Sequence, residues 1–129
     1  MCTSEQTYPQ SICFFPTPNL ERTRAFYQDT LGLQLTLDQG ACHIYRASPT
    51  GFIGFCTHRE QDPAEGVIIT LVDPEVETTC ERLRKLGVTI ERGPGFNRDF
   101  QITQAFLRDP SGYLVEIQRF EDPRWPAAP

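Results

Sequence analysis

The chain contains an internal repeat of a turn that runs into a strand-like segment. Residues 48–56 read Ser-Pro-Thr-Gly followed by an apolar run, and residues 109–117 read Asp-Pro-Ser-Gly followed by a similar run. When the two copies are superposed on their turn glycines, Phe55 falls opposite Glu116. Each copy is preceded by a helix-like segment that ends at a Leu-Gly pair. A repeat of this length predicts two similar structural modules in one chain.

Hydrophobic periodicity gives both modules the same order of elements: a strand, a helix and three further strands. In the first module we expect a strand at 11–16, a helix between the N-cap Asn19 and Gly32, and strands at 33–37, 42–45 and 52–57. In the second module we expect a strand at 66–72, a helix from Asp73 and Pro74 to Gly87, strands at 88–91, 104–108 and 113–120, and a long loop at 93–101.

These elements predict an α+β fold of two tandem βαβββ modules. The expected organisation is an N-terminal segment at 1–9, a first module at 10–58, a connector at 59–65, a second module at 66–121 and an irregular proline-rich tail at 122–129. Trp125 is expected to anchor this tail against a neighbouring surface. With 129 residues and 39% hydrophobic side chains, the chain is long enough to bury a core.

Composition limits the classes of function. The net charge is −5 and no cluster of Lys and Arg occurs, which argues against a nucleic-acid partner. No apolar run approaches the roughly 20 residues that cross a bilayer, and the N-terminus lacks the order of a secretory signal, so we expect no membrane partner. Five cysteines occur without a CxxC pair, and Cys13, Cys42 and Cys56 lie in strand-like runs. This pattern predicts buried free thiols and a reduced, cytoplasmic setting.

Several motifs together resemble one known superfamily. They are Asn-Leu-Glu-Arg-Thr-Arg-Ala-Phe-Tyr at 19–27, Leu-Gly-Leu at 31–33 and Asp-Pro-Ser-Gly-Tyr-Leu-Val-Glu-Ile at 109–117. With the two βαβββ units, they are similar to the vicinal oxygen chelate superfamily, which includes glyoxalases, extradiol dioxygenases and bleomycin-resistance proteins. The resemblance covers roughly residues 10–120. It implies a curled mixed-sheet cup and a homodimer whose modules pair within one chain or across two, but it does not fix the reaction.

The resemblance also implies where a metal would be bound. Metal-dependent members take four ligands, usually His, Gln or Glu, from the first and fourth strands of each module. The corresponding positions in this chain are Ile12, Phe55, Ile68 and Glu116. Three of these side chains are hydrocarbons, and one carboxylate does not hold a divalent cation against water. We therefore expect no metal site and no cofactor.

Only two imidazoles are available as further donors. His43 lies on a middle strand and His58 at the end of the fourth strand of the first module. We interpret both as structural or surface histidines. A non-standard metal site of His43, His58 and Glu116 is the alternative, and no spacing motif supports it.

Strand alternation predicts the lining of the cup if Glu116 faces inward, as the resemblance implies. The side chains expected to face inward are Ile12, Phe14, Ile53, Phe55, Thr57, Ile68, Thr70, Leu114, Glu116 and Gln118, whereas Cys13, Phe15, Gly54, Val115 and Ile117 are expected to face the helices. Phe96, Arg98 and Phe100 on the long loop are expected to form a lid. The candidate ligand-binding residues are therefore Phe14, Phe55, Thr70, Phe96, Arg98, Phe100, Glu116 and Gln118. In the alternative, Phe14 and Phe55 fill the cup and leave no pocket.

Glu116 is the candidate on which the function depends. A carboxylate among apolar side chains is costly to ionise unless a cation or hydrogen-bond donors compensate it. It would serve as a general acid or base if the chain catalyses a reaction, or it would bind a cationic ligand. A structural salt bridge with Arg46, Arg98 or Arg108 is the alternative.

The function we predict is that of a metal-free small-molecule-binding protein, which sequesters an aromatic or cationic compound in an apolar cup around Glu116. One alternative is a lyase, isomerase or dioxygenase that holds a divalent metal through non-standard ligands. Another is a non-catalytic assembly or regulatory module. The sequence itself does not decide whether the chain is an enzyme.

Overall fold

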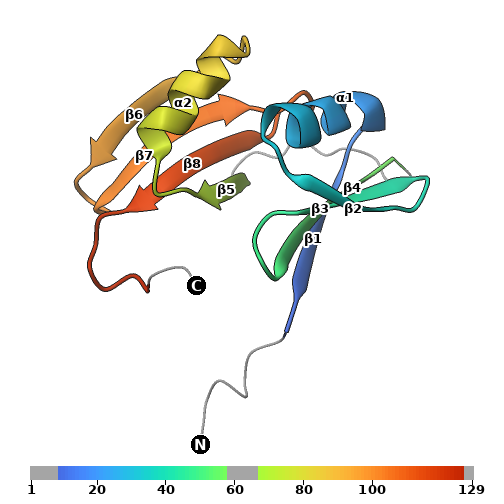
Figure 1. Ribbon diagram of the computed structural model, residues 1–129, viewed down its shortest axis with the longest axis horizontal. Coiled ribbons are helices and arrows are strands. Elements are labelled where there is room, and N and C mark those ends of the chain that lie inside the picture. The colour runs from blue at the N-terminus through green and yellow to red at the C-terminus, as the bar shows by residue number, and fades with distance from the viewer. Residues whose placement is uncertain (1–8, 58–66, 127–129) are drawn as a thin grey trace, which may run out of the picture. The chain divides into compact units, whose positions relative to one another are not determined.

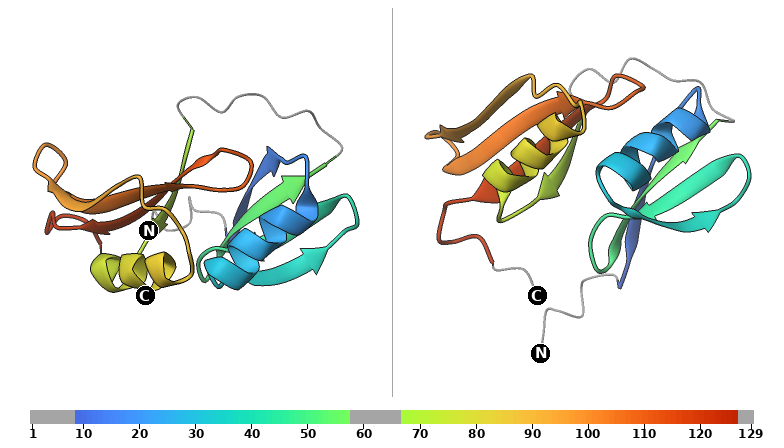
Figure 2. Two further views of the ribbon diagram at one scale, coloured as in Figure 1. Left: turned by 90° about the horizontal axis from the view of Figure 1, so that it is seen from above. Right: turned by 45° about the horizontal axis from the view of Figure 1, so that its top comes forward.

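A computed structural model describes residues 9–57 and 67–126 of the chain. The chain divides into two compact units, residues 1–63 and 64–129, which correspond to the two repeats. Each contains a four-stranded mixed sheet with a helix packed on one face (Figures 1 and 2). The expected α+β fold of two βαβββ modules is therefore confirmed. None of the helices within the described residues is long and apolar enough to cross a bilayer.

The first module contains six elements. They are β1 (Ser11–Pro16), α1 (Leu20–Arg24), η2 (Ala25–Thr30), β2 (Gln34–Asp38), β3 (Cys42–Arg46) and β4 (Gly51–Cys56). The strand order in its sheet is β1-β4-β3-β2. β1 runs parallel to β4, and the other pairs are antiparallel. This pattern follows from the connections, because short turns join β2, β3 and β4, whereas the helical segment lies between β1 and β2.

The helix of the first module begins where the sequence indicates and then widens. The Asn19 side chain caps it by accepting a hydrogen bond of 3.0 Å from the backbone N–H of Arg22. From Ala25 the turns are those of a π-helix. Tyr27 on this segment is fully buried, and its ring lies 4.6 Å from the ring of Phe55 on β4. Aromatic packing between helix and sheet thus forms the core of this module.

The second module repeats the topology. Its elements are β5 (Ile68–Val72), α2 (Val76–Lys85), β6 (Arg92–Asn97), β7 (Ile102–Arg108) and β8 (Leu114–Phe120). The strand order is β5-β8-β7-β6, with β5 parallel to β8. The buried α2 residues Val76, Cys80 and Leu83 define the helix-facing side of the core. At the start of β8, Asp109 accepts backbone hydrogen bonds from Ser111 and Tyr113, which fixes the turn before the strand.

Two boundaries in the second module differ from the sequence-based expectation. The helix begins at Val76, because the Asp73 carboxylate accepts the backbone N–H of Glu75 and so belongs to the turn that precedes the helix. The expected strand at 88–91 is absent, and β6 occupies most of the segment expected to be a long loop. A register shift between Arg92 and Gly95 accommodates the Gly-Pro pair, since proline has no N–H to donate to a sheet.

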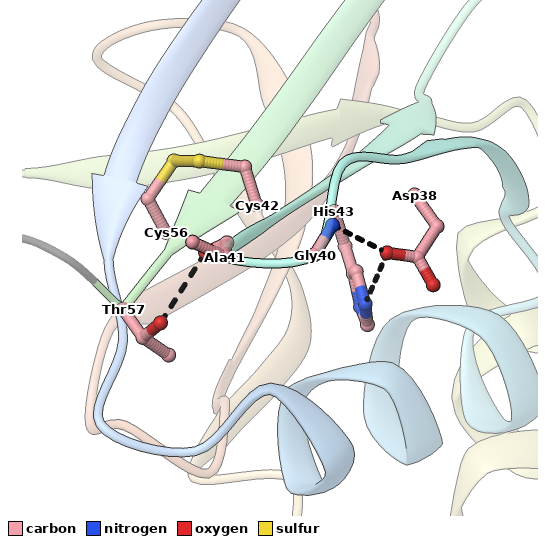
Figure 3. The surroundings of a disulfide bond; sticks show 7 residues. All are labelled: Asp38, Gly40, Ala41, Cys42, His43, Cys56 and Thr57. Carbon is pink, nitrogen blue, oxygen red and sulfur yellow. Dashed lines mark hydrogen bonds and ion pairs between the residues drawn. A yellow bond between two sulfur atoms is a disulfide. The ribbon is translucent and has the colours of Figure 1, made fainter.

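The expectation of free thiols at Cys42 and Cys56 is wrong. These residues lie directly opposite each other on β3 and β4, with their Cα atoms 4.1 Å apart, and form a disulfide (Figure 3). Directly opposed positions of antiparallel strands bring the Cβ atoms close enough to be linked. Cys13 is a free thiol but is exposed, contrary to the expectation that it is buried, and Cys80 is a buried free thiol. The disulfide removes the argument from cysteine usage for a reduced setting.

Arg119 on β8 ties the sheet of the second module to the start of α2. Its guanidinium donates two hydrogen bonds, of 2.9 and 3.0 Å, to the carboxylate of Glu77 and one of 3.0 Å to the carbonyl of Pro74. The hydrogen bond with Arg119 lowers the pKa of Glu77 from 4.5 to about 2.

We predict that Glu77→Gln lowers the Tm at pH 7 by an amount that shrinks in acid. The folded pKa lies below the ordinary one, so the stabilisation is fully present above pH 4.5 and is lost as the pH falls towards 2. Thermal unfolding from pH 7 to pH 2 measures this dependence, and added salt should reduce the difference, because the pair is solvent-exposed. Glu81→Gln, on an exposed position of the same helix, is the control. An equal Tm difference at pH 7 and pH 2 would contradict the prediction.

Candidate functional site

A hydrogen-bonded carboxylate occupies the face of the second sheet that points away from α2. This face, which we call the distal face, carries Thr70, Gln104, Phe106, Leu114, Glu116 and Gln118. Glu116 is only 6% exposed. Its Oε1 accepts a hydrogen bond of 2.8 Å from the Thr70 hydroxyl, and its Oε2 accepts one of 2.6 Å from the Gln104 amide. Asn97 in turn donates to the Gln104 side-chain carbonyl at 3.0 Å.

The strand register places these groups together. Thr70 on β5 lies opposite Glu116 on β8, and Glu116 lies opposite Phe106 on β7. Phe106 lies opposite Arg92 on β6, so one row of side chains crosses all four strands. Val115, adjacent to Glu116, is fully buried on the helix-facing side. Alternation along β8 therefore sends the carboxylate to the distal face, away from α2.

Neutral donors, rather than an arginine, compensate the Glu116 carboxylate. Of the arginines considered as partners, Arg108 binds the carboxylate of Glu91, with 3.3 Å between Nε and Oε2. Arg46 donates to the Pro49 carbonyl, and Arg98 is exposed. No ion pair within the described residues involves Glu116. The salt-bridge interpretation is therefore wrong, and the two hydrogen bonds lower the cost of burying the charge.

A pocket that mixes apolar and charged side chains lies on the same face, next to Glu116. It has a volume of about 290 Å³ and is lined by Glu91, Arg92, Phe106, Arg108 and Leu114. The Arg92 guanidinium carbon lies 4.5 Å from the centroid of the Phe106 ring. Phe106 is the cross-strand neighbour of Glu116, and Leu114 lies two residues before it on β8. A ligand in this pocket would therefore contact the two apolar side chains that flank the carboxylate.

The position equivalent to Glu116 in the first module is Gly54. The helix N-caps Asn19 and Glu75 align Phe14 with Thr70, five residues before each cap. Phe14 pairs with Gly54, just as Thr70 pairs with Glu116. A Cβ added to Gly54 would lie 2.5 Å from the ring of Phe14, which fills the space of the missing side chain.

Phe55 therefore faces the helix, contrary to the expectation that it lines the cup. Its ring is fully buried against Tyr27, and its neighbour Gly54 shares the other face with Phe14. The misassignment arises at the turn, because Gly54 lies three residues after Gly51, whereas Glu116 lies four residues after Gly112. Superposing the turn glycines thus shifts β4 against β8 by one residue, which reverses the expected face of every side chain on β4.

The donor set of the described residues does not fit a divalent cation. Ile12 and Ile68 supply only hydrocarbon, Gly54 has no side chain, and both Glu116 oxygens accept hydrogen bonds. No group of three or more His, Cys, Asp or Glu side chains that could hold a metal occurs among residues 9–57 and 67–126. Such a site requires three or four protein ligands.

Of the two histidines, His43 lies within the described residues and is buried. His43 is 4% exposed, and its Nε2 lies 3.4 Å from Asp38 of the adjacent strand (Figure 3). Across β3 and β4 it lies opposite the helix-facing Phe55. His43 therefore belongs to the helix-facing side of its own module. His58 lies outside the described residues.

The expected lid residues do not gather around the carboxylate. Phe96 lies opposite Thr103, one position away from Gln104, and so belongs to the other face of the sheet. Phe96 is 61% exposed and Phe100 is 70% exposed. Phe100 instead lines a separate pocket of about 300 Å³ with Phe120, Asp122, Arg124 and Trp125. The stack of Trp125 on Phe120, with ring centroids 3.8 Å apart, anchors the tail as expected.

Among the residues of the site that sequence reasoning missed are Arg92, Asn97, Gln104 and Phe106. Gln104 and Phe106 alternate on one face of β7, which was a visible signal, but their register against β8 was not readable from the sequence. Arg92 and Asn97 were missed because their strand contains Gly93, Pro94 and Gly95, a composition typical of loops.

We predict that Thr70→Val destabilises the protein by about 1–3 kcal/mol, because the buried Glu116 Oε1 loses its donor. Thr70→Ser retains the hydroxyl and should cost less than half as much. Urea unfolding of both variants measures the difference. Equal losses in the two variants would show that the methyl group, not the hydroxyl, supports this position.

The chain is similar in sequence or in fold to several known proteins. A lactoylglutathione lyase of Salmonella typhimurium is 29% identical over 120 residues, covering 81% of this chain and 87% of the relative. Among solved structures, TnmS3, an antibiotic binding protein from Streptomyces sp. CB03234, matches with a TM-score of 0.77 at 20% identity, covering 89% of this chain and 98% of that one.

A glyoxalase/bleomycin resistance protein/dioxygenase from Nocardioides also matches, with a TM-score of 0.69 at 19% identity, covering 98% of this chain and 94% of that one. Both structural matches establish the fold alone, because fold does not fix function. The family model of the Glyoxalase/Bleomycin resistance protein/Dioxygenase superfamily matches residues 11–117. The chain belongs to the Glyoxalase/Bleomycin resistance protein/Dioxygenase superfamily.

Proposed function

We propose that this protein is a metal-free small-molecule-binding protein that holds an aromatic or cationic compound against Glu116. The observation that carries this proposal is a buried carboxylate that neutral donors fix in place beside a pocket in which Phe106 and Leu114 supply apolar surface. Such a group supplies a hydrogen-bond acceptor and a negative charge in a setting of low dielectric, where both act strongly on a ligand.

The remaining acceptor capacity of Glu116 favours a ligand that donates hydrogen bonds. Each carboxylate oxygen can accept about two hydrogen bonds, and each accepts one within the network. An ammonium or amidinium group would use the remaining lone pairs and balance the charge. The apolar side chains of Phe106 and Leu114 would cover the hydrocarbon part of the same ligand. TnmS3, an antibiotic binding protein, has the same fold, so this fold is compatible with small-molecule binding.

One observation favours a second candidate function, a lyase that depends on a divalent metal. The lactoylglutathione lyase relative is 29% identical over most of both chains. The donor set around Gly54 and Glu116 argues against this function, because only one of the two positions carries a ligand group. Turnover of lactoylglutathione in the presence of added Zn²⁺ or Ni²⁺ would favour the lyase, and its absence would favour the binding protein.

We predict that aromatic ammonium compounds bind the protein and that Glu116→Gln weakens their binding about tenfold or more. A charge-assisted hydrogen bond contributes about 1.5–3 kcal/mol, and the glutamine removes the charge while it keeps the size of the side chain. Thermal shift against a panel of benzylammonium compounds, followed by titration calorimetry, measures this effect.

Glu81→Gln provides the matched control, since it removes the same charge from an exposed position on α2. It should bind the panel as the unmodified protein does. Equal affinity of the Glu116→Gln variant and the unmodified protein would refute the role of this carboxylate. A panel without any hit would refute the class of ligand.

A further inference from the structure

Arg92 lies on the distal face, and the proposed function assigns no role to its positive charge. It begins β6, and its guanidinium lies over the ring of the buried Phe106, 4.5 Å from the ring centroid. A guanidinium held in this way is attracted by the face of the ring. The N–H donors of a guanidinium point outward from the edges of its plane, so contact with the ring does not use them.

Arg92 differs in this respect from the other arginine of the pocket. Arg108 is engaged by Glu91 at 3.3 Å and donates to the Gly112 carbonyl at 3.1 Å. By contrast, no carboxylate in the described part of the second module lies within salt-bridge distance of Arg92. The pocket therefore contains one arginine that is neutralised and one that is available to an anion.

Arg92 and Glu116 lie on either side of Phe106 in the row of side chains that crosses the four strands. Arg92 pairs with Phe106, and Phe106 pairs with Glu116, so two strand spacings separate the cation from the carboxylate. Two spacings amount to about 10 Å between the backbones. Phe106 lies between the two charges and is among the apolar side chains that line the pocket. The row thus presents positive charge, apolar surface and negative charge in that order.

We infer that the ligand of this site is a zwitterionic aromatic small molecule, with a carboxylate that binds Arg92 and an ammonium group that binds Glu116 across an apolar body. This inference rests on the proposed function and adds the second charge to it. A planar guanidinium suits a carboxylate, because two parallel N–H donors match its two oxygens. A ligand with only one charged end would leave one of these two protein charges without a partner.

Three probes of equal ring size test this inference. para-(Aminomethyl)phenylacetate carries both charges, para-methylbenzylamine carries only the ammonium group, and para-methylphenylacetate carries only the carboxylate. Titration calorimetry should show that the first probe binds the unmodified protein at least about tenfold more tightly than either of the others, as expected when a second charge-assisted contact is added.

Substitutions then assign each end of the probe. Arg92→Gln should weaken binding of the two carboxylate-bearing probes about tenfold and leave para-methylbenzylamine unchanged. Arg92→Lys, which keeps the charge but loses the forked geometry, should give an intermediate affinity for the two carboxylate-bearing probes. Lys85→Gln, which removes a cation at the end of α2, is the control and should change nothing. Thermal unfolding of each variant checks that the fold is intact.

The outcomes separate this inference from the proposed function. If para-methylbenzylamine binds through Glu116 but Arg92→Gln has no effect on any probe, the zwitterionic ligand is refuted and the proposed function stands. If Arg92→Gln weakens all three probes equally, Arg92 supports the pocket structurally and the inference is also refuted. If no probe depends on Glu116, both proposals fail.

Discussion

The buried Glu116 carboxylate requires hydrogen-bond donors, and this requirement links three strands of the second module. A charged oxygen that is removed from water must be compensated, or the module loses stability. Thr70 supplies one donor from the parallel neighbour of β8, and Gln104 supplies the other from the antiparallel neighbour. The carboxylate is therefore fixed only when both strands have their native register, so the sheet and the site are specified together.

The two modules use the same topology for different purposes. At equivalent positions, the second module places Glu116 opposite Thr70, and the first places Gly54 opposite Phe14. The Phe14 ring occupies the space that a side chain at Gly54 would need, so the first module presents hydrocarbon where the second presents an acid. A repeat that provided two symmetric ligand positions would suit a chelated cation. Only the second module provides an acceptor at this position, which is why we propose a ligand that donates to it.

The sequence predicted the fold well because the evidence for it is local and occurs twice. The turn at 109–112 and the cap at Asn19 are specified by residues close together in the chain, and the structure places them as expected. The site was predicted less completely because it depends on register between distant strands. Phe55 was assigned to the wrong face by a shift of one residue, and Gln104 was not recognised as the partner of Glu116. Short strands rich in glycine and proline, such as β6, also give no periodic signal.

The central claim is that Glu116 is an acceptor for a ligand and not a member of a metal site. Equilibrium dialysis of the full chain against Mn²⁺, Ni²⁺ and Zn²⁺ in turn, followed by elemental analysis, tests this claim directly when Glu116→Gln is dialysed in parallel. The account predicts less than stoichiometric metal in both proteins and no difference between them. One equivalent of a divalent metal that the unmodified protein retains at micromolar concentration, and that the variant loses, would contradict it.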